Sequence, residues 1–155
     1  MTGADTRQQI HVEEATRVDD ELLAAITSLV PQLSSSAPAI GVDSLREICA
    51  SPTTCLLIAR DDDETIVGTL TLVVFRIPTG VRAWIEDVVV DIDHRGRGVG
   101  EELVRAAMKR AVAAQARTID LTSRSSRVEA LRLYKRLGFE TYETNFLRSS
   151  LNGDR

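Results

Sequence analysis

WIEDVVVDIDHRGRGVGEELV, residues 84–104, decides the fold, because it predicts a strand that runs through a basic, glycine-rich turn into a helix. Three β-branched residues suit the strand: Val88, Val89 and Val90. Three glycines mark the turn, where they let the backbone bend tightly and bring N–H groups close to a ligand: Gly96, Gly98 and Gly100. The helix N-terminus adds a positive pole, and Arg95 and Arg97 add full charges. The stretch therefore predicts an anion site of the kind that holds a phosphate.

Two common phosphate-binding motifs do not fit this turn. A dinucleotide fingerprint G-x-G-x-x-G would need glycine where Glu101 or Leu103 stands, and the Gly-Lys-Ser/Thr of a Walker-type loop is absent. The spacing Arg95-x-x-Gly98-x-Gly100 does fit R/Q-x-x-G-x-G/A. In this respect the stretch resembles the acyl-coenzyme A signature of the GNAT family of N-acetyltransferases.

A second segment strengthens the resemblance. RVEALRLYKRLGFE, residues 127–140, is similar to the later helix of that family and its closing Gly-Phe, with Tyr134 in the tyrosine position. The resemblance implies a mixed α/β (α+β) chain with the GNAT fold, a central, mostly antiparallel twisted sheet flanked by helices on both faces. It also implies an acyltransferase that uses acetyl-coenzyme A as cosubstrate.

The same resemblance assigns the coenzyme-binding residues. The backbone at Val88 and Val90 would pair with the pantetheine arm, and the turn from Arg95 to Gly100 would hold the pyrophosphate. Arg127 departs from the pattern, since many relatives have Asn there, although an arginine could reach a phosphate or sugar. The full set expected from the resemblance is Val88, Val89, Val90, Arg95, Gly96, Arg97, Gly98, Val99, Gly100 and Arg127.

Two residues are candidates for the proton transfers. Glu86 is the candidate base, on the same strand face as Trp84 and Val88 if side chains alternate regularly; a water could relay the proton. A bulge, which the family often has at this strand, would change the assignment of faces. Its alternative role is an exposed strand carboxylate paired with an arginine. Tyr134 matches the general acid of the family, and its alternative role is a core tyrosine with a satisfied hydroxyl. The expected reaction is direct transfer of an acetyl group to a primary amine.

Composition limits the other functions. At 155 residues with 43% hydrophobic content, the chain has the size of one domain, which we expect to span residues 9–155 after a disordered tail, 1–8. A net charge of −4 and the lack of a long basic run argue against nucleic acid as a partner. Neither a signal peptide nor a bilayer-spanning apolar run is present, so we expect a cytoplasmic protein without a membrane partner.

The cysteines and histidines indicate no metal site. Cys49 and Cys55 stand in apolar segments and are interpreted as two buried reduced thiols. No histidine partner is suggested by their spacing, which argues against a thiol that carries the acetyl group. His11 and His94 have no second ligand at metal spacing, so no metal cofactor is expected.

Patterning predicts the remaining elements. Ile10 and Val12 indicate a first strand, Asp19 caps a helix that extends toward Leu33 past Pro31, and Ser44 with Glu47 forms a capping box for a second helix. Residues 34–41 are expected to form a loop. The other expected strands are 54–60, 65–77, 81–91 and 118–122, and the other expected helices 98–114 and 128–137. Further strands are expected through Tyr142 and Phe146.

The acceptor is left open by the sequence. Its pocket is expected between the first two helices, the loop 34–41 and the C-terminal strands, a set that includes Tyr142, Glu143, Asn145 and Phe146. A small-molecule amine is the first hypothesis, and an acidic pocket would favour polyamines or aminoglycosides. The alternatives are a peptide or protein N-acetyltransferase that needs a partner, and a non-catalytic acyl-coenzyme A sensor. The family also allows a homodimer.

Overall fold

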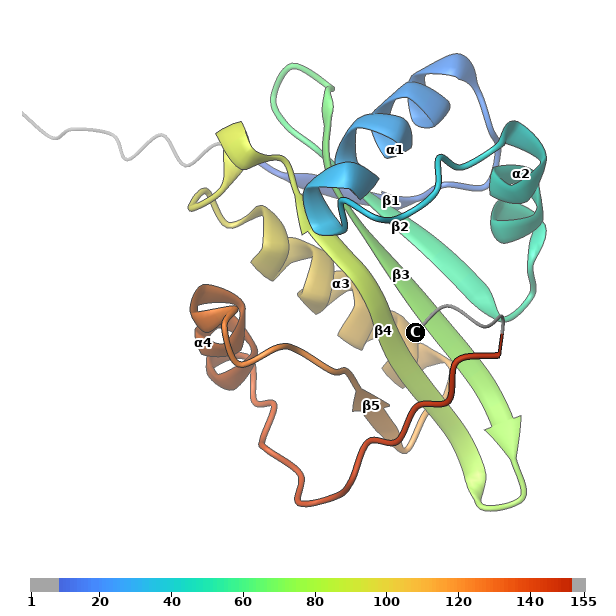
Figure 1. The fold of residues 1–155 in the computed structure, drawn as a ribbon, viewed down its shortest axis with the longest axis vertical. Coiled ribbons are helices and arrows are strands. Elements are labelled where there is room, and N and C mark those ends of the chain that lie inside the picture. Colours follow the sequence, from blue (N-terminus) through green and yellow to red (C-terminus); the bar gives the residue numbers. More distant parts are fainter. Residues whose placement is uncertain (1–8, 152–155) are drawn as a thin grey trace, which may run out of the picture.

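The computed structural model describes residues 9–151. Within them, five strands form one sheet in the order β1-β2-β3-β4-β5 (Figure 1). The first three pairings are antiparallel, and β4 pairs with β5 in parallel. The strands are β1 (His11–Glu14), β2 (Thr54–Arg60), β3 (Ile66–Ile77), β4 (Gly80–Val90) and β5 (Thr118–Asp120). The mostly antiparallel sheet that the resemblance implies is confirmed.

Helices cover both faces of the sheet. Figure 1 shows α1 (Asp20–Leu33) and α2 (Val42–Ala50) on the near face and α3 (Val99–Ala113) behind the strands. Each face has its own apolar cluster, one built on the two early helices and one on α3 and the short helix α4 (Val128–Arg136). The structure therefore confirms the mixed α/β fold class. No helix in the described part of the chain is both long and apolar enough to cross a membrane.

The strand β4 contains a bulge at Asp87, between the candidate base Glu86 and the expected coenzyme-binding residue Val88. Its register with β3 shifts between Thr69 and Thr71, and Asp87 opposite this shift has a left-handed φ of 49°. A bulge changes which face the following side chains occupy. Ile85 and Val88 consequently pack against the same apolar cluster, which regular alternation would not allow. Regular alternation, under which Val88 would share a face with Glu86, therefore does not hold, and the bulge is the arrangement present.

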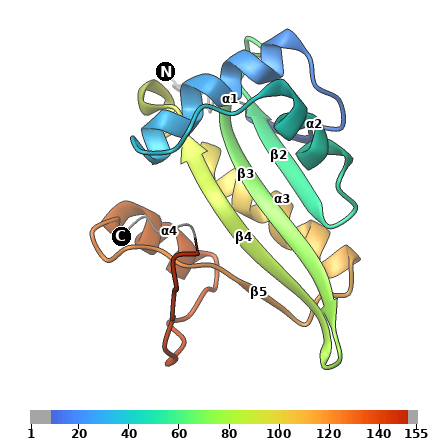
Figure 2. The same ribbon diagram turned by 45° about the vertical axis from the view of Figure 1, so that its right-hand side comes forward.

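β4 and β5 separate after Trp84, ahead of the bulge. Their parallel pairing covers only Arg82–Trp84 and Thr118–Asp120, and Figure 2 shows β5 leading away from β4 toward α4. Among residues 9–151 no strand pairs with β4 from Ile85 onward on its β5 side. The backbone of this part of β4 is thus available to a ligand.

The early helices meet the expectations in part. Asp19 caps α1, because its Oδ1 accepts a 2.8 Å hydrogen bond from the N–H of Leu22, and the helix continues through Pro31 to Leu33. The capping box of Ser44 and Glu47 is wrong: α2 begins at Val42, with Gly41 as an N-cap that offers no side-chain bond. The earlier start places the fully buried Leu45 against the sheet.

The C-terminal strands expected through Tyr142 and Phe146 are also wrong. β5 is the last strand in the described residues, and positions 140–151 are irregular and exposed. Tyr142 is 86% exposed. Alternating residues form a strand only when another strand supplies backbone partners, and here none does.

Candidate active site

Two cavities lie where β4 and β5 separate. The first, about 590 Å³, extends over the glycine-rich turn, the end of β4 and the inner side of α4. The second, about 740 Å³, lies beside Glu86 and the segment that follows β5. Both are lined by Leu33, Val88, Ser126, Arg127 and Tyr134. These shared walls make the two cavities neighbours in one site.

The glycine-rich turn has the geometry that its sequence predicts. Gly96 and Gly98 have φ values of 75° and 85°, a backbone region that disfavours any side chain. Gly98 is the N-cap of α3, and a Cβ on it would meet no atom within 4 Å, so the space above the helix N-terminus is open. A Cβ on Gly100 would lie 3.3 Å from Leu133 Cδ2. The turn therefore combines exposed N–H groups with close packing of α3 on α4.

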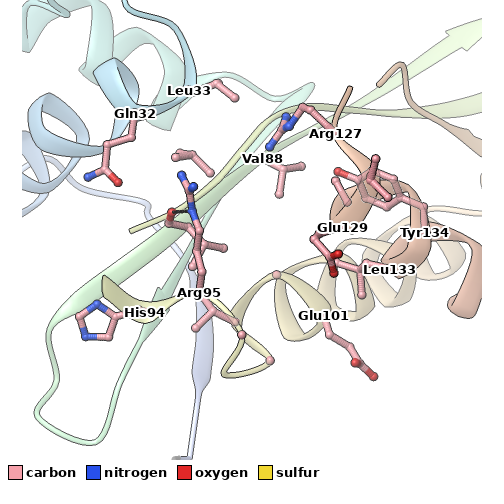
Figure 3. A pocket seen from close by; sticks show the side chains of 18 of the residues that line it. Gln32, Leu33, Val88, His94, Arg95, Glu101, Arg127, Glu129, Leu133 and Tyr134 are labelled. Atoms are coloured by element: carbon pink, nitrogen blue, oxygen red, sulfur yellow. Dashed lines mark hydrogen bonds between the residues drawn. The ribbon is translucent and has the colours of Figure 1, made fainter. Parts of the chain in front are cut away.

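Arg95 extends along the end of β4. Its Nε donates a 3.2 Å hydrogen bond to the carbonyl oxygen of Val90, and Figure 3 shows the side chain passing between Gln32 and Val88. Nine of the ten expected coenzyme-binding residues line the first cavity, and Arg97 is the one that does not. The structure thus brings the glycine turn, the end of β4 and Arg127 together around one space.

A polar network that the sequence did not reveal supports the first half of the turn. Gln32 from α1 donates to Asp91 Oδ2 at 3.1 Å and accepts from the N–H of Ile92 at 2.9 Å. His94 lies between two carboxylates, with Nδ1 3.1 Å from Asp91 Oδ1 and Nε2 3.4 Å from the buried Asp61. The hydrogen bonds from Gln32 and His94 hold the pKa of Asp91 below its ordinary value. This network ties α1 and the β2–β3 turn to the base of the anion site.

Acidic residues in the first turn of α3 would repel an anion unless they were neutralised. Glu101 accepts hydrogen bonds from Arg105 at 2.7 and 3.1 Å, and Arg136 from α4 lies 3.5 Å away. These cations, Arg105 first, lower the pKa of Glu101. Glu101 and Arg105 stand four residues apart on α3, the spacing at which side chains of a helix meet.

Glu86 lies in the second cavity, at the start of the β4 bulge. The indole Nε1 of Trp84 donates a 2.8 Å hydrogen bond to Glu86 Oε1, so these two residues share a strand face as predicted. The next residue, Asp87, lines the same cavity. Two carboxylates are thus presented together at the open edge of β4.

Tyr134 lies between the two cavities. Its side chain is only 6% exposed, its ring packs edge-on against Phe139 with centroids 5.8 Å apart, and Figure 3 shows its hydroxyl end directed toward Val88 and Arg127. Burial raises the pKa of Tyr134, and the nearby Arg127 offsets part of that rise. The phenol is therefore held in its neutral, proton-bearing form.

Segments other than β4 give the second cavity a basic wall, which the sequence did not predict. Arg124 follows β5, and Arg148 comes from the C-terminal segment, where its guanidinium lies 5.4 Å from the centre of the Phe146 ring. Ser123 on this wall has a buried hydroxyl oxygen without a hydrogen-bond partner in the described structure. Of the acceptor-lining residues expected from the sequence, Phe146 lines this cavity, whereas Tyr142, Glu143 and Asn145 line neither.

The two cysteines line neither cavity. Both are free and half-buried. Burial, together with the charge of Glu14, raises the pKa of Cys55 to about 11 and that of Cys49 in the same direction. Neither is placed or ionised as a nucleophile of this site.

Solved structures with the same fold include acetyltransferases. A transcriptional regulator from Bacillus halodurans C-125 is 27% identical, with 92% of this chain and 100% of that chain covered and a TM-score of 0.78. An aminoglycoside acetyltransferase from an uncultured soil metagenomic sample is 18% identical, with coverage of 94% and 98% and a TM-score of 0.76. The aminoglycoside N-acetyltransferase AAC(6′)-Iy in complex with coenzyme A is 16% identical, with coverage of 96% and 99% and a TM-score of 0.74.

Sequence comparison points to the same class. The model of the acetyltransferase (GNAT) family matches residues 22–139, which is most of the chain. No curated protein sequence matches significantly. The matched region includes the glycine-rich turn, both strands that form the site, and α4 with Tyr134.

Proposed function

Because the chain belongs to the GNAT family of acetyltransferases, we propose that it transfers an acetyl group from acetyl-coenzyme A directly to a primary amine of a small molecule. The observation that carries this proposal is the pair of adjoining cavities, one with the anion-binding turn and one with Glu86, which share Tyr134. Such a pair gives each substrate its own space and a common boundary at which they react.

The first cavity would take the coenzyme. Its pyrophosphate would lie on the N–H groups of the turn and the N-terminus of α3, where Arg95 and Arg127 supply positive charge. The pantetheine arm would use the unpaired edge of β4 at Val88 and Val90. Arg95 would then release the carbonyl oxygen of Val90, which it holds in this structure.

The second cavity would take the amine. In the transfer, the amine nitrogen forms a bond to the thioester carbon, the C–S bond breaks, and the products are an amide and the coenzyme thiol. An amine with a pKa near 10.4 is neutral in only about one molecule in a few thousand at pH 7, so removal of its proton matters. We assign this role to Glu86, directly or through a water, because its carboxylate is oriented by Trp84 and lines this cavity.

Tyr134 would return a proton to the leaving thiolate. With ordinary pKa values near 10 for tyrosine and 8.5 for a thiol, the transfer is uphill by roughly 2 kcal/mol. The raised pKa of Tyr134 increases that difference, which suits a hydrogen-bond donor that stabilises the thiolate before the proton moves. No covalent acetyl-enzyme is needed, in keeping with the protonated thiol of Cys55.

Calorimetric titration with acetyl-coenzyme A tests the proposal. The wild-type protein should bind, and the Arg95→Ala, Arg127→Ala double variant should bind at least about tenfold more weakly, because hydrogen bonds to charged groups contribute about 1.5–3 kcal/mol. The matched control is Arg46→Ala, Arg76→Ala, which removes two exposed arginines, one on α2 and one on β3, that line neither cavity. Absence of binding by the wild-type protein would remove the coenzyme assignment and both catalytic roles.

Thiol release during incubation with amines is the second step of the test. Release that depends on the amine supports an enzyme. Binding of the coenzyme without release to any amine would instead favour an acyl-coenzyme A sensor.

A further inference from the structure

The second cavity carries charges of both signs on separate walls. Glu86 and Asp87 lie on β4, whereas Arg124 and Arg148 lie on the segments after β5 and α4. Arg127, which we assign to the coenzyme, also reaches this space. A polyamine or aminoglycoside would meet this basic wall with like charge, so the cavity does not suit a polycation.

Within residues 9–151, no carboxylate neutralises the charges of the basic wall. In the part of the chain that the structure describes, neither the Arg124 nor the Arg148 side chain has a carboxylate partner. Several other arginines in the described residues do bind carboxylates, at 2.7–3.5 Å. The two free guanidiniums therefore retain their capacity to hold an oxyanion in a bidentate way.

Two further features indicate that this wall is arranged for a ligand. The ring of Phe146 supports the Arg148 guanidinium at 5.4 Å, which orients a side chain that would otherwise move freely. The Ser123 hydroxyl oxygen is buried at the same wall and lacks a partner, which costs free energy unless a ligand or water satisfies it.

From these observations we infer that the acceptor is an amine that also bears a carboxylate, as a free amino acid does. Its ammonium group would lie at Glu86 and Asp87, and its carboxylate at Arg124 and Arg148 with the Ser123 hydroxyl as a further donor. The bound carboxylate would orient the amine toward Tyr134 and the thioester. This inference names the acceptor of the site and rests on the proposed function.

The test compares acceptors that differ only in charge. The standard amino acids, their α-amides and spermidine are each incubated with acetyl-coenzyme A and the protein, and thiol release is followed. The amine of an amino acid amide loses its proton more readily than that of the free acid, so intrinsic reactivity favours the amide. We expect at least one free amino acid to exceed its amide in kcat/KM by about tenfold, which corresponds to about 1.4 kcal/mol.

Variants of the two arginines test whether these side chains bind the carboxylate of the acceptor. Arg148→Gln and Arg124→Gln should each raise KM for the preferred amino acid by roughly five- to tenfold while leaving kcat/KM for its amide within about twofold. The control is Arg76→Gln, which removes an exposed arginine on β3 that lines neither cavity. Equal losses for acid and amide would overturn the carboxylate role, because a merely structural effect does not depend on the acceptor's charge.

The outcomes separate this inference from the proposed function. If acetyl-coenzyme A binds and spermidine or the amides are the better acceptors, the function stands and the inference is wrong. If the coenzyme binds and no amino acid accepts the acetyl group, the inference is again wrong. If the coenzyme does not bind, the proposed function itself fails.

Discussion

The indole of Trp84 holds the carboxylate of Glu86 through a 2.8 Å hydrogen bond along one face of β4. The bulge at Asp87 follows directly, so the carboxylate is fixed just before the strand changes the face that it presents. A strand edge normally leaves a glutamate free to rotate. Here the contact restricts it to the cavity that we assign to the amine.

Replacement of Glu86 tests its role as base. Glu86→Gln keeps the size and the hydrogen bond acceptor for Trp84 but cannot take a proton. We expect kcat/KM to fall by about 10²-fold near pH 6.5 and by much less near pH 9, where more of the amine is already neutral. A pH–rate profile is the measurement. A uniform loss at all pH values, or none, would exclude the base role, and Trp84→Phe, which retains the carboxylate, should lose less activity at every pH.

Replacement of Tyr134 separates catalysis from coenzyme binding. Tyr134→Phe removes the hydroxyl and keeps the ring that packs on Phe139, so the fold should persist. We expect kcat to fall by roughly tenfold or more, with the Kd for acetyl-coenzyme A within about twofold of wild type. Phe139→Leu is a useful control, since it disturbs the same packing without removing a proton donor. A fully active Tyr134→Phe protein would return Tyr134 to a purely structural role.

The sequence predicts this site best where its signal is local. The glycine spacing of the turn indicates backbone conformations with positive φ, and Gly98 has such a left-handed φ. The strand ranges of the meander also follow from patterning, because each strand pairs with its neighbour along the chain. The place of Tyr134 in the site could be expected from the sequence, because the residues around it match the later helix of the family.

Features that depend on distant segments could not be predicted in this way. The approach of Gln32 to Asp91 joins residues 59 positions apart, and no local periodicity encodes it. Arg124 and Arg148 stand in irregular segments, so nothing in their neighbours indicates that they line one cavity. A rule of alternation cannot locate the bulge at Asp87, so the face of Val88 could be predicted from the sequence only under the condition of regular pleating.

Substitution of Gly98 measures the cost of the turn conformation. Gly98 and Gly41 are both N-caps without side-chain bonds, but only Gly98 has a positive φ, 85° against −83°. Gly98→Ala should destabilise the protein by about 1–2 kcal/mol more than Gly41→Ala, because both lose the same capping preference and only one acquires left-handed strain. Urea unfolding of the two variants gives the difference. Equal midpoints would mean that the turn relaxes and that its geometry is not fixed.

The cysteines should react slowly in the folded protein. With a pKa of about 11, the Cys55 thiol is ionised in roughly one molecule in a thousand at pH 8, so we expect iodoacetamide labelling on the order of a hundredfold slower than for a free thiol. Labelling in guanidinium should be fast for both cysteines. Glu14→Gln should accelerate labelling of Cys55, because the Glu14 charge and hydrogen bond contribute to the raised pKa. A folded protein that labels at the free-thiol rate would contradict this environment.

Asp91 should make the stability of the protein sensitive to acid. Its pKa is lowered in the folded state by hydrogen bonds from Gln32 and His94, whereas an unfolded carboxyl has a pKa near 3.9. The stabilisation is therefore complete above the unfolded value and disappears as pH falls through the lower, folded value. Asp91→Asn should lower the free energy of unfolding by about 1–2 kcal/mol at pH 6 and by clearly less at pH 3, as measured by urea unfolding.

The control Asp43→Asn changes an exposed carboxylate on α2 and should leave the wild-type pH dependence in place. If Asp91→Asn costs as much at pH 3 as at pH 6, ionisation of Asp91 is not what ties α1 to the anion-binding turn.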